Sequence, residues 1–339
     1  MTGYVNRAVK PSRKSERGFS LIETMVAMAL LLVVSAGMME AMLRLSRVEN
    51  SVYNRSAMHD GVRSATELLQ QEVGQAGSIT LPAPVTLTQA VAAGPNTVTV
   101  SSVSNMFVNE FLVIDAGLAE ETVQVAAVGT SPPSITATFL QAHPSGAPVA
   151  VRGGFATGIV PCVNQAACPG SAVGAATFAN GSTGYVLKLY GDINDDGRMV
   201  YVEYTCDINA GILYRNVIDN AVTPGAAPAK PAPGPTQILL DNLTDPDTGR
   251  VPCFVYQQQT VLPNTFVTNV AISLTTRAQF RDRSAGIQKE TKSLLNVAPR
   301  NVFNSWLLAS MATSNRVHSI PQSIVSLLPT PNVVTGQAP

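Results

Sequence analysis

Residues 17–39, RGFSLIETMVAMALLLVVSAGMM, decide the organisation of this chain of 339 residues. The 21-residue run from Phe19 to Met39 contains one charge, Glu23, and is long enough to cross about 30 Å of hydrocarbon as a helix. The residues before it carry one acid, Glu16, and five bases: Arg7, Lys10, Arg13, Lys14 and Arg17. Because basic flanks stay on the cytoplasmic side of a membrane, everything after Met39 is predicted to be exported.

The apolar run is predicted to stay attached to the rest of the protein. An ordinary secretory signal places a small-residue cleavage site after its apolar run, whereas here a helical sequence continues beyond Met39. Glu23 is then a carboxylate inside a membrane helix, which costs about 2.5–3.5 kcal/mol on insertion scales. Such a residue usually marks a function with a partner. The alternative is that Glu23 lies near the interface and reaches water.

The stretch Arg17-Gly18-Phe19-Ser20-Leu21-Ile22-Glu23, between a basic leader and an apolar helix, resembles the class III signal of type IV pilins and pseudopilins. The resemblance implies that residues 1–18 are a leader peptide. A prepilin peptidase would cut between Gly18 and Phe19 on the cytoplasmic side and methylate Phe19. Glu23 would match the acid that pairs with a neighbouring subunit's amino terminus. Pairing two charges that are each costly in lipid would offset both costs and fix the axial register.

Residues 19–77 are predicted to form one N-terminal helix, of which residues 19–39 span the membrane. Gly74, Gly77 and Pro82 supply its stop signals. Beyond the membrane, apolar residues recur at helical spacing and are expected to dock on a globular domain. They are Met42, Leu45, Val48, Val52, Met58, Val62, Ala65, Leu68, Leu69 and Val73.

The remainder is predicted to be β structure, because short alternating runs are separated by glycine and proline turns. Residues 78–155 are expected to form a β-rich module, a candidate insertion, with strands near 97–103, 110–116, 121–128 and 134–140. Residues 156–305 are expected to form a pilin-like antiparallel β domain, and residues 306–339 a C-terminal tail. The predicted fold class is α+β, with a long N-terminal helix packed on an antiparallel sheet and an additional small β module. His143 is expected to be a loop residue rather than a ligand.

A calcium-loop pattern occurs between two predicted strands of the second β region. Asp192, Asn194, Asp196 and Gly197 have the spacing of an EF-hand loop, and Glu203 stands at its twelfth position. These residues would supply short oxygen ligands, a sharp turn and a closing carboxylate. EF-hand loops join helices, however, and Asp-Asp-Gly between strands is a hairpin signal. A structural turn is therefore the default expectation, and calcium is the one candidate cofactor.

All four cysteines lie on the predicted exported side, which favours two disulfides. Three connectivities are open, and the preferred one is Cys162–Cys168 with Cys206–Cys253. The first bridge would close a short loop, and the second would tie two strand regions. The competing interpretation is a zinc site built from all four thiolates.

Composition argues against catalysis and against nucleic-acid binding. The chain has 22 basic and 22 acidic residues and is only 13% charged, and the predicted mature chain would have 17 basic and 21 acidic residues. The three histidines, His59, His143 and His318, are scattered in the sequence. No serine-hydrolase, zinc-protease or phosphate-loop motif is present. The protein is predicted not to be an enzyme.

The resemblance implies a minor type IV pilin, most similar to PilW-like minor pilins, which primes the pilus or becomes part of it. Adhesion, twitching motility or DNA uptake would follow downstream. Its partners would be other pilin subunits, prepilin peptidase, the inner-membrane assembly machinery and, before assembly, lipid. The protein would begin as a single-pass inner-membrane protein and end in the pilus at the cell surface. The alternatives are a type II secretion pseudopilin and, from another class, a membrane-anchored adhesin that never polymerises.

Overall fold

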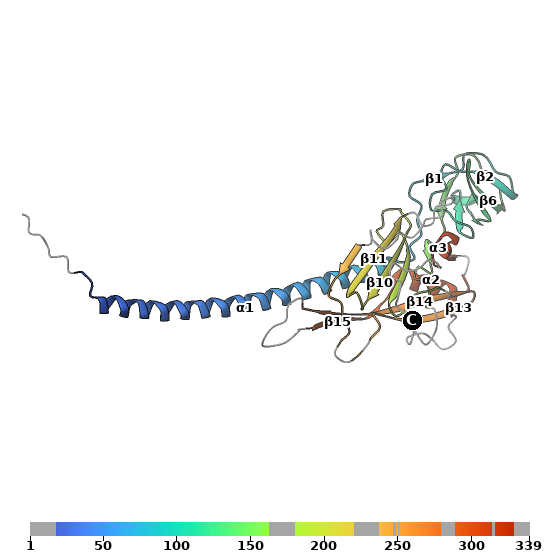
Figure 1. The fold of residues 1–339 in the computed structure, drawn as a ribbon. Helices are drawn as coiled ribbons and strands as arrows, with labels where there is room; N and C mark the ends of the chain where they lie inside the picture. Colours follow the sequence, from blue (N-terminus) through green and yellow to red (C-terminus); the bar gives the residue numbers. More distant parts are fainter. Residues whose placement is uncertain are drawn as a thin grey trace, which may run out of the picture. The chain divides into compact units, whose positions relative to one another are not determined.

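The computed structural model describes residues 18–162, 180–219, 237–246, 249, 251–278, 289–313 and 316–328. The chain divides into two compact units, residues 1–54 and residues 55–339. A long helix precedes a series of strands, and two shorter helices lie near the carboxyl end of the chain (Figure 1). A long apolar N-terminal helix followed by antiparallel sheets confirms the predicted α+β class.

The first unit consists mainly of the amino-terminal part of helix α1, which runs from Leu21 to Gln75 (Figure 1). The backbone carbonyl of Ser20 accepts the N–H groups of Glu23 and Thr24, at 3.0 and 3.1 Å, so the helix begins immediately after Ser20. α1 contains an 18-residue window of mean hydropathy 2.1, no part of which is buried. By length and composition, this helix is able to cross a membrane.

The carboxyl-terminal part of α1 packs into the core of the second unit. Burial begins at Met58 and continues on one face through Val62, Ala65, Leu69 and Val73. This half of the predicted apolar stripe is confirmed. Met42, Leu45, Val48 and Val52 belong to the first unit and are exposed there, and their docking stays a prediction. Helical spacing identifies the apolar face of a helix, but it does not say how many turns the sheet covers.

Two antiparallel sheets build the core that covers α1. One has the order β12-β11-β10-β9, from Gln237–Leu240, Ile212–Asp219, Val200–Asp207 and Val186–Gly191. The other has the order β13-β14-β15, from Phe254–Val261, Asn264–Arg277 and Lys289–Val297. Strand β14 pairs with β15, from Val270 opposite Val297 to Arg277 opposite Lys289. Residues from α1, both sheets and α2 (Arg300–Ser310) share one hydrophobic cluster.

The β module between α1 and these sheets has a core of its own. One of its sheets has the order β1-β7-β3-β4, from Val85–Thr86, Pro148–Val151, Phe111–Ile114 and Glu121–Gln124. The other has the order β2-β6-β5, from Gly94–Thr99, Pro133–Phe139 and Ala127–Thr130. The short 3-10 helix η1, Gly117–Ala119, connects β3 to β4. The predicted strand 121–128 is therefore divided between two sheets, β4 and β5.

The C-terminal segment returns to the module instead of forming a tail throughout. After α2, strand β16 (Val317–His318) pairs in parallel with β8 (Phe155–Ala156), and α3 (Gln322–Leu327) follows. A third hydrophobic cluster joins α3 and β10 to Phe107 of the module. Alternation and turn signals could not indicate this, because the contacts depend on residues far apart in the chain.

Candidate functional site

The predicted processing and assembly residues lie at the start of α1. Gly18 and Phe19 precede the helix, and Phe19 is exposed. Glu23 lies in the first turn of α1 and is also exposed. An acid at this position is favoured by the partial positive charge of a helix amino terminus. The structure therefore leaves both Phe19 and Glu23 accessible to another molecule. Residues 1–17, the rest of the predicted leader, lie outside the described residues.

A buried ion pair fixes the other end of α1 to the sheet. The Glu72 carboxylate accepts hydrogen bonds from both Nε and Nη2 of Arg215 on β11, the Nε donor at 3.1 Å from Oε1. The Tyr204 hydroxyl on β10 also donates to Glu72. Burial lowers the pKa of Arg215, but the Glu72 carboxylate more than compensates and holds it above its ordinary value. This cluster fixes the angle and register at which α1 meets the sheet.

Glu72 was not anticipated from the sequence, although a signal for it was present. It stands beside Leu69 and Val73 on the apolar face of α1, where an acid requires a buried partner. The partner, Arg215, lies within the L-x-R segment Leu213-Tyr214-Arg215 of β11. Helical spacing places Glu72 in the core, but only the fold identifies Arg215.

Comparison with family models gives one match, to the prokaryotic N-terminal methylation motif, over residues 13–39. The chain carries a prepilin-type signal. The motif supports a type IV pilin-like or pseudopilin-like protein, a structural rather than a typically enzymatic class. It implies processing by a prepilin peptidase and assembly with pilin machinery, and together with the apolar helix it fits a membrane-anchored protein. The curated proteins include no match to the chain.

The predicted calcium-loop residues 192–197 form the hairpin turn between β9 and β10. Asp192 is buried, and its two oxygens accept the N–H groups of Asp196 and Gly197, each at 3.0 Å, and the hydroxyl of Thr80 at 2.7 Å. These bonds close the turn and tie it to the chain just after α1.

The other predicted ligands point to different surroundings. Asn194 and Asp196 are exposed, whereas Glu203 is buried on β10 and accepts the Tyr201 hydroxyl at 2.8 Å. Within the described part of the chain, no three His, Cys, Asp or Glu side chains are grouped to hold a metal ion. This geometry supports the structural turn, and calcium binding stays a prediction to be tested.

The cysteines link the two sheets of the larger core. Cys206, on β10, and Cys253, just before β13, form a disulfide with a Cα–Cα distance of 6.5 Å. Cys162 is buried and disulfide-bonded, and its predicted partner, Cys168, lies outside the described residues. The zinc alternative is therefore wrong, because Cys162, Cys206 and Cys253 carry no free thiolates.

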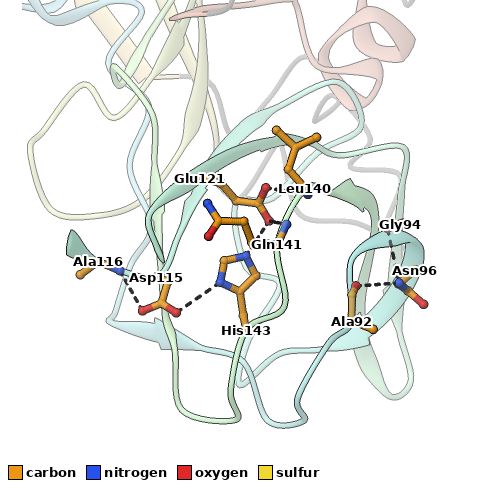
Figure 2. Close-up of polar contacts among 9 residues, drawn as sticks. All are labelled: Ala92, Gly94, Asn96, Asp115, Ala116, Glu121, Leu140, Gln141 and His143. Carbon is orange, nitrogen blue, oxygen red and sulfur yellow. Dashed lines mark hydrogen bonds and ion pairs between the residues drawn. The ribbon is translucent and has the colours of Figure 1, made fainter. Parts of the chain in front are cut away.

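A buried carboxylate–histidine–carboxylate cluster lies inside the β module (Figure 2). His143 Nε2 is 2.5 Å from Glu121 Oε1, and His143 Nδ1 is 3.2 Å from Asp115 Oδ2. The His143 side chain is fully buried, and the other oxygen of Glu121 accepts the N–H of Leu140 at 2.7 Å. Both carboxylates accept a hydrogen bond from the ring at once only when both ring nitrogens carry a hydrogen.

His143 is a loop residue, as expected, but the loop is anchored in the module core. It bridges Val91 through the backbone and packs edge-on against Phe139. The N–H of Ala116 and the His143 ring together lower the pKa of Asp115. The cluster ties the ends of β3 and β4 to the segment after β6, which gives it a structural role within the module.

Proposed function

We propose that this protein is a minor type IV pilin, a structural subunit that is processed by prepilin peptidase and then primes the pilus or is incorporated into it. The observation that carries the proposal is the methylation motif over residues 13–39, with Glu23 in the first turn of an apolar helix. Phe19 and Glu23 are both exposed in the single chain. The amino-terminal cation at Phe19 of one subunit would pair with the Glu23 carboxylate of the next. Each charge would then neutralise another that is costly in lipid.

A role as a low-copy subunit is supported by the size and content of the second unit. Residues 55–339 contain a complete sheet domain and a module with its own core. A subunit copied thousands of times along a fibre has no evident need for such bulk, whereas a tip or priming subunit can display it. The PilW-like assignment rests on a resemblance to such minor pilins, which often have an Asp-Gly turn followed by an aromatic strand and an L-x-R segment. Here these are the turn at 196–197 and the segment 213–215. The protein would move from the inner membrane, with its carboxyl-terminal part exported, to the pilus and cell surface.

The first test is the N-terminal mass of the protein recovered from sheared surface filaments. A chain that begins at N-methylated Phe19 supports processing and fibre incorporation together. A chain that still begins at Met1, and is found only in membranes of cells with an active peptidase, overturns the proposal. That second outcome favours the anchored adhesin.

The second test separates assembly from display. Glu23→Ala should remove the protein from filaments while leaving its membrane level unchanged. Glu40→Ala is the matched control, because Glu40 lies on the same helix and pairs only with the exposed Arg44 among the described residues. A secretion pseudopilin would also require Glu23, but its loss would reduce secretion of exported enzymes rather than the number of pili. An adhesin would be displayed normally with either substitution.

A further inference from the structure

The β module meets the rest of the second unit at a buried junction that contains Phe107 and His318. Phe107 does not belong to the module's own core but to the third cluster, together with Ile324 and Leu327 of α3. The ring of His318 packs edge-on against the rings of Phe107 and Phe111, each centroid 6.0 Å away. His318 has no exposed surface. The junction therefore holds the C-terminal segment against the module.

The hydrogen bonds of His318 require a neutral imidazole. The Phe111 N–H donates to Nδ1 at 3.4 Å, and Nε2 donates to the Arg152 carbonyl at 3.0 Å. One nitrogen must therefore accept and the other must donate, which only the neutral ring with its proton on Nε2 achieves. Protonation would place an N–H on Nδ1, facing another N–H donor, and would bury a charge between aromatic rings.

Glu110, one residue before Phe111, is the acidic group at the same junction. It is fully buried, and its Oε2 accepts the Phe107 N–H at 3.1 Å. Its Oε1 is buried with no hydrogen-bond partner, and no cation lies within ion-pair distance, in the part of the chain that the structure describes. A carboxylate in this position would be neither solvated nor paired, so the site accommodates the protonated acid.

The other titratable groups near the junction are Arg152, two buried tyrosines and Glu203. Arg152 supplies the carbonyl that His318 contacts, and its guanidinium donates to Thr122. Tyr190 and Tyr201, in the third cluster, have a pKa that burial raises, and Tyr201 donates its hydroxyl to Glu203.

We propose that Glu110 and His318 form a latch in which both side chains are uncharged. The latch holds the module against the C-terminal segment only while the Glu110 carboxyl is protonated and the His318 imidazole is unprotonated. Opening the junction exposes both groups to water, where the acid releases a proton and the imidazole takes one up. Burial raises the pKa of Glu110 from 4.5 to about 8 and lowers that of His318 from 6.5 to about 4. The latch does not depend on whether the chain is a minor pilin.

The two shifts act on the latch in opposite directions. Glu110 stabilises the closed state at low pH and loses this effect as pH rises from about 4.5 to about 8. His318 stabilises it at high pH and loses this effect as pH falls from about 6.5 to about 4. Between about pH 4.5 and 6.5 opening exchanges one proton for another, so the opening equilibrium is constant. Above about 6.5 opening becomes tenfold more favourable per pH unit, up to about 8.

The test is hydrogen exchange of the full chain in detergent micelles, with protection factors for residues 107–111 and 317–327 compared with those of β10. In the wild type, protection at the junction should be constant from pH 5 to 6 and fall about tenfold per unit above about 6.5. With Glu110→Gln, protection should instead fall about tenfold per unit as pH decreases below about 6.5. With His318→Gln, it should fall as pH increases from about 5 upward. Glu120→Gln and His59→Gln, which alter exposed groups, should reproduce the wild-type profile.

Two results would overturn the latch. One is a pair of Gln variants whose pH profiles match the wild type, because then neither group titrates on opening. The other comes from NMR of the histidine-labelled wild type, which needs no variant to fold. At pH 6, His318 should be neutral with its proton on Nε2. A protonated ring, or a proton on Nδ1, would contradict the hydrogen-bond pattern on which the proposal stands.

Discussion

Glu72 of helix α1 and Arg215 of strand β11 form a two-point ion pair in the protein interior, joined by the hydroxyl of Tyr204. The side chain of Glu72 is 3% exposed and that of Arg215 is 16% exposed. This pair is the main polar contact between the N-terminal helix and the sheet in the described part of the chain.

Glu72→Gln should strongly destabilise the protein. Removing one charge leaves Arg215 buried without its counter-ion, which typically costs about 3–5 kcal/mol. The measurement is the free energy of unfolding from urea denaturation in micelles. Glu67→Gln is the control, because Glu67 pairs with Arg63 on the exposed face of α1, where solvent screens the pair, and its loss should have little effect on stability. Equal effects of both substitutions would contradict a structural role for the buried pair.

Glu121→Gln should destabilise the β module. The substitution leaves His143 with one carboxylate, that of Asp115, and removes the strongest acceptor in the cluster. A loss of about 3–5 kcal/mol is expected for a broken buried pair. The adjacent Glu120 is exposed, so Glu120→Gln should be nearly silent. Hydrogen exchange in β3, β4 and β6 would locate the effect, and unchanged protection there would exclude the cluster as the module's anchor.

Replacing both Cys206 and Cys253 with alanine should lower stability by about 4 kcal/mol, because the bridge closes a loop of 47 residues in the unfolded chain. Thermal unfolding with and without reductant measures this loss. Reductant should have a smaller effect on the double variant than on the wild type. If reductant leaves the wild type unchanged, the bridge contributes little to stability.

Gly77 and Gly74 give a matched pair at the end of α1. Gly77 has φ of +84°, and a Cβ there would lie 2.8 Å from the Ala156 carbonyl oxygen, so Gly77→Ala should destabilise by about 2–3 kcal/mol. Gly74 is within the helix and has open space around it, so Gly74→Ala should stabilise by about 0.5–1 kcal/mol. Melting temperatures that shift in the same direction would contradict this assignment of the helix end.

Asp192→Ala should destabilise the β9–β10 turn with or without calcium. It removes the acceptor for Thr80, Asp196 and Gly197, at a cost of about 1–3 kcal/mol. Calorimetry with calcium should show no binding heat, and a chelator should leave melting unchanged. Binding heat that disappears in the variant would instead establish the calcium loop.

Much of the organisation follows from the sequence alone. The leader charges, Gly18, Phe19 and Glu23 before an apolar run predict the processing motif, because these properties are local and depend on spacing. Periodicity predicts α1 to within a few residues and most of the strands for the same reason. Spacing left three disulfide connectivities open, and the structure contains the Cys206–Cys253 bridge of the preferred one.

Tertiary structure alone decided which polar residues meet. Glu72 and Arg215 are 143 positions apart, and Phe111 and His318 are 207 apart. Periodicity shows that such a residue faces the core, but the identity of its partner depends on sheet order and on the return of the C-terminal segment. The same physics limits what the apolar face of α1 predicts. An apolar face is a local property of the sequence, whereas the surface that covers it exists only after folding.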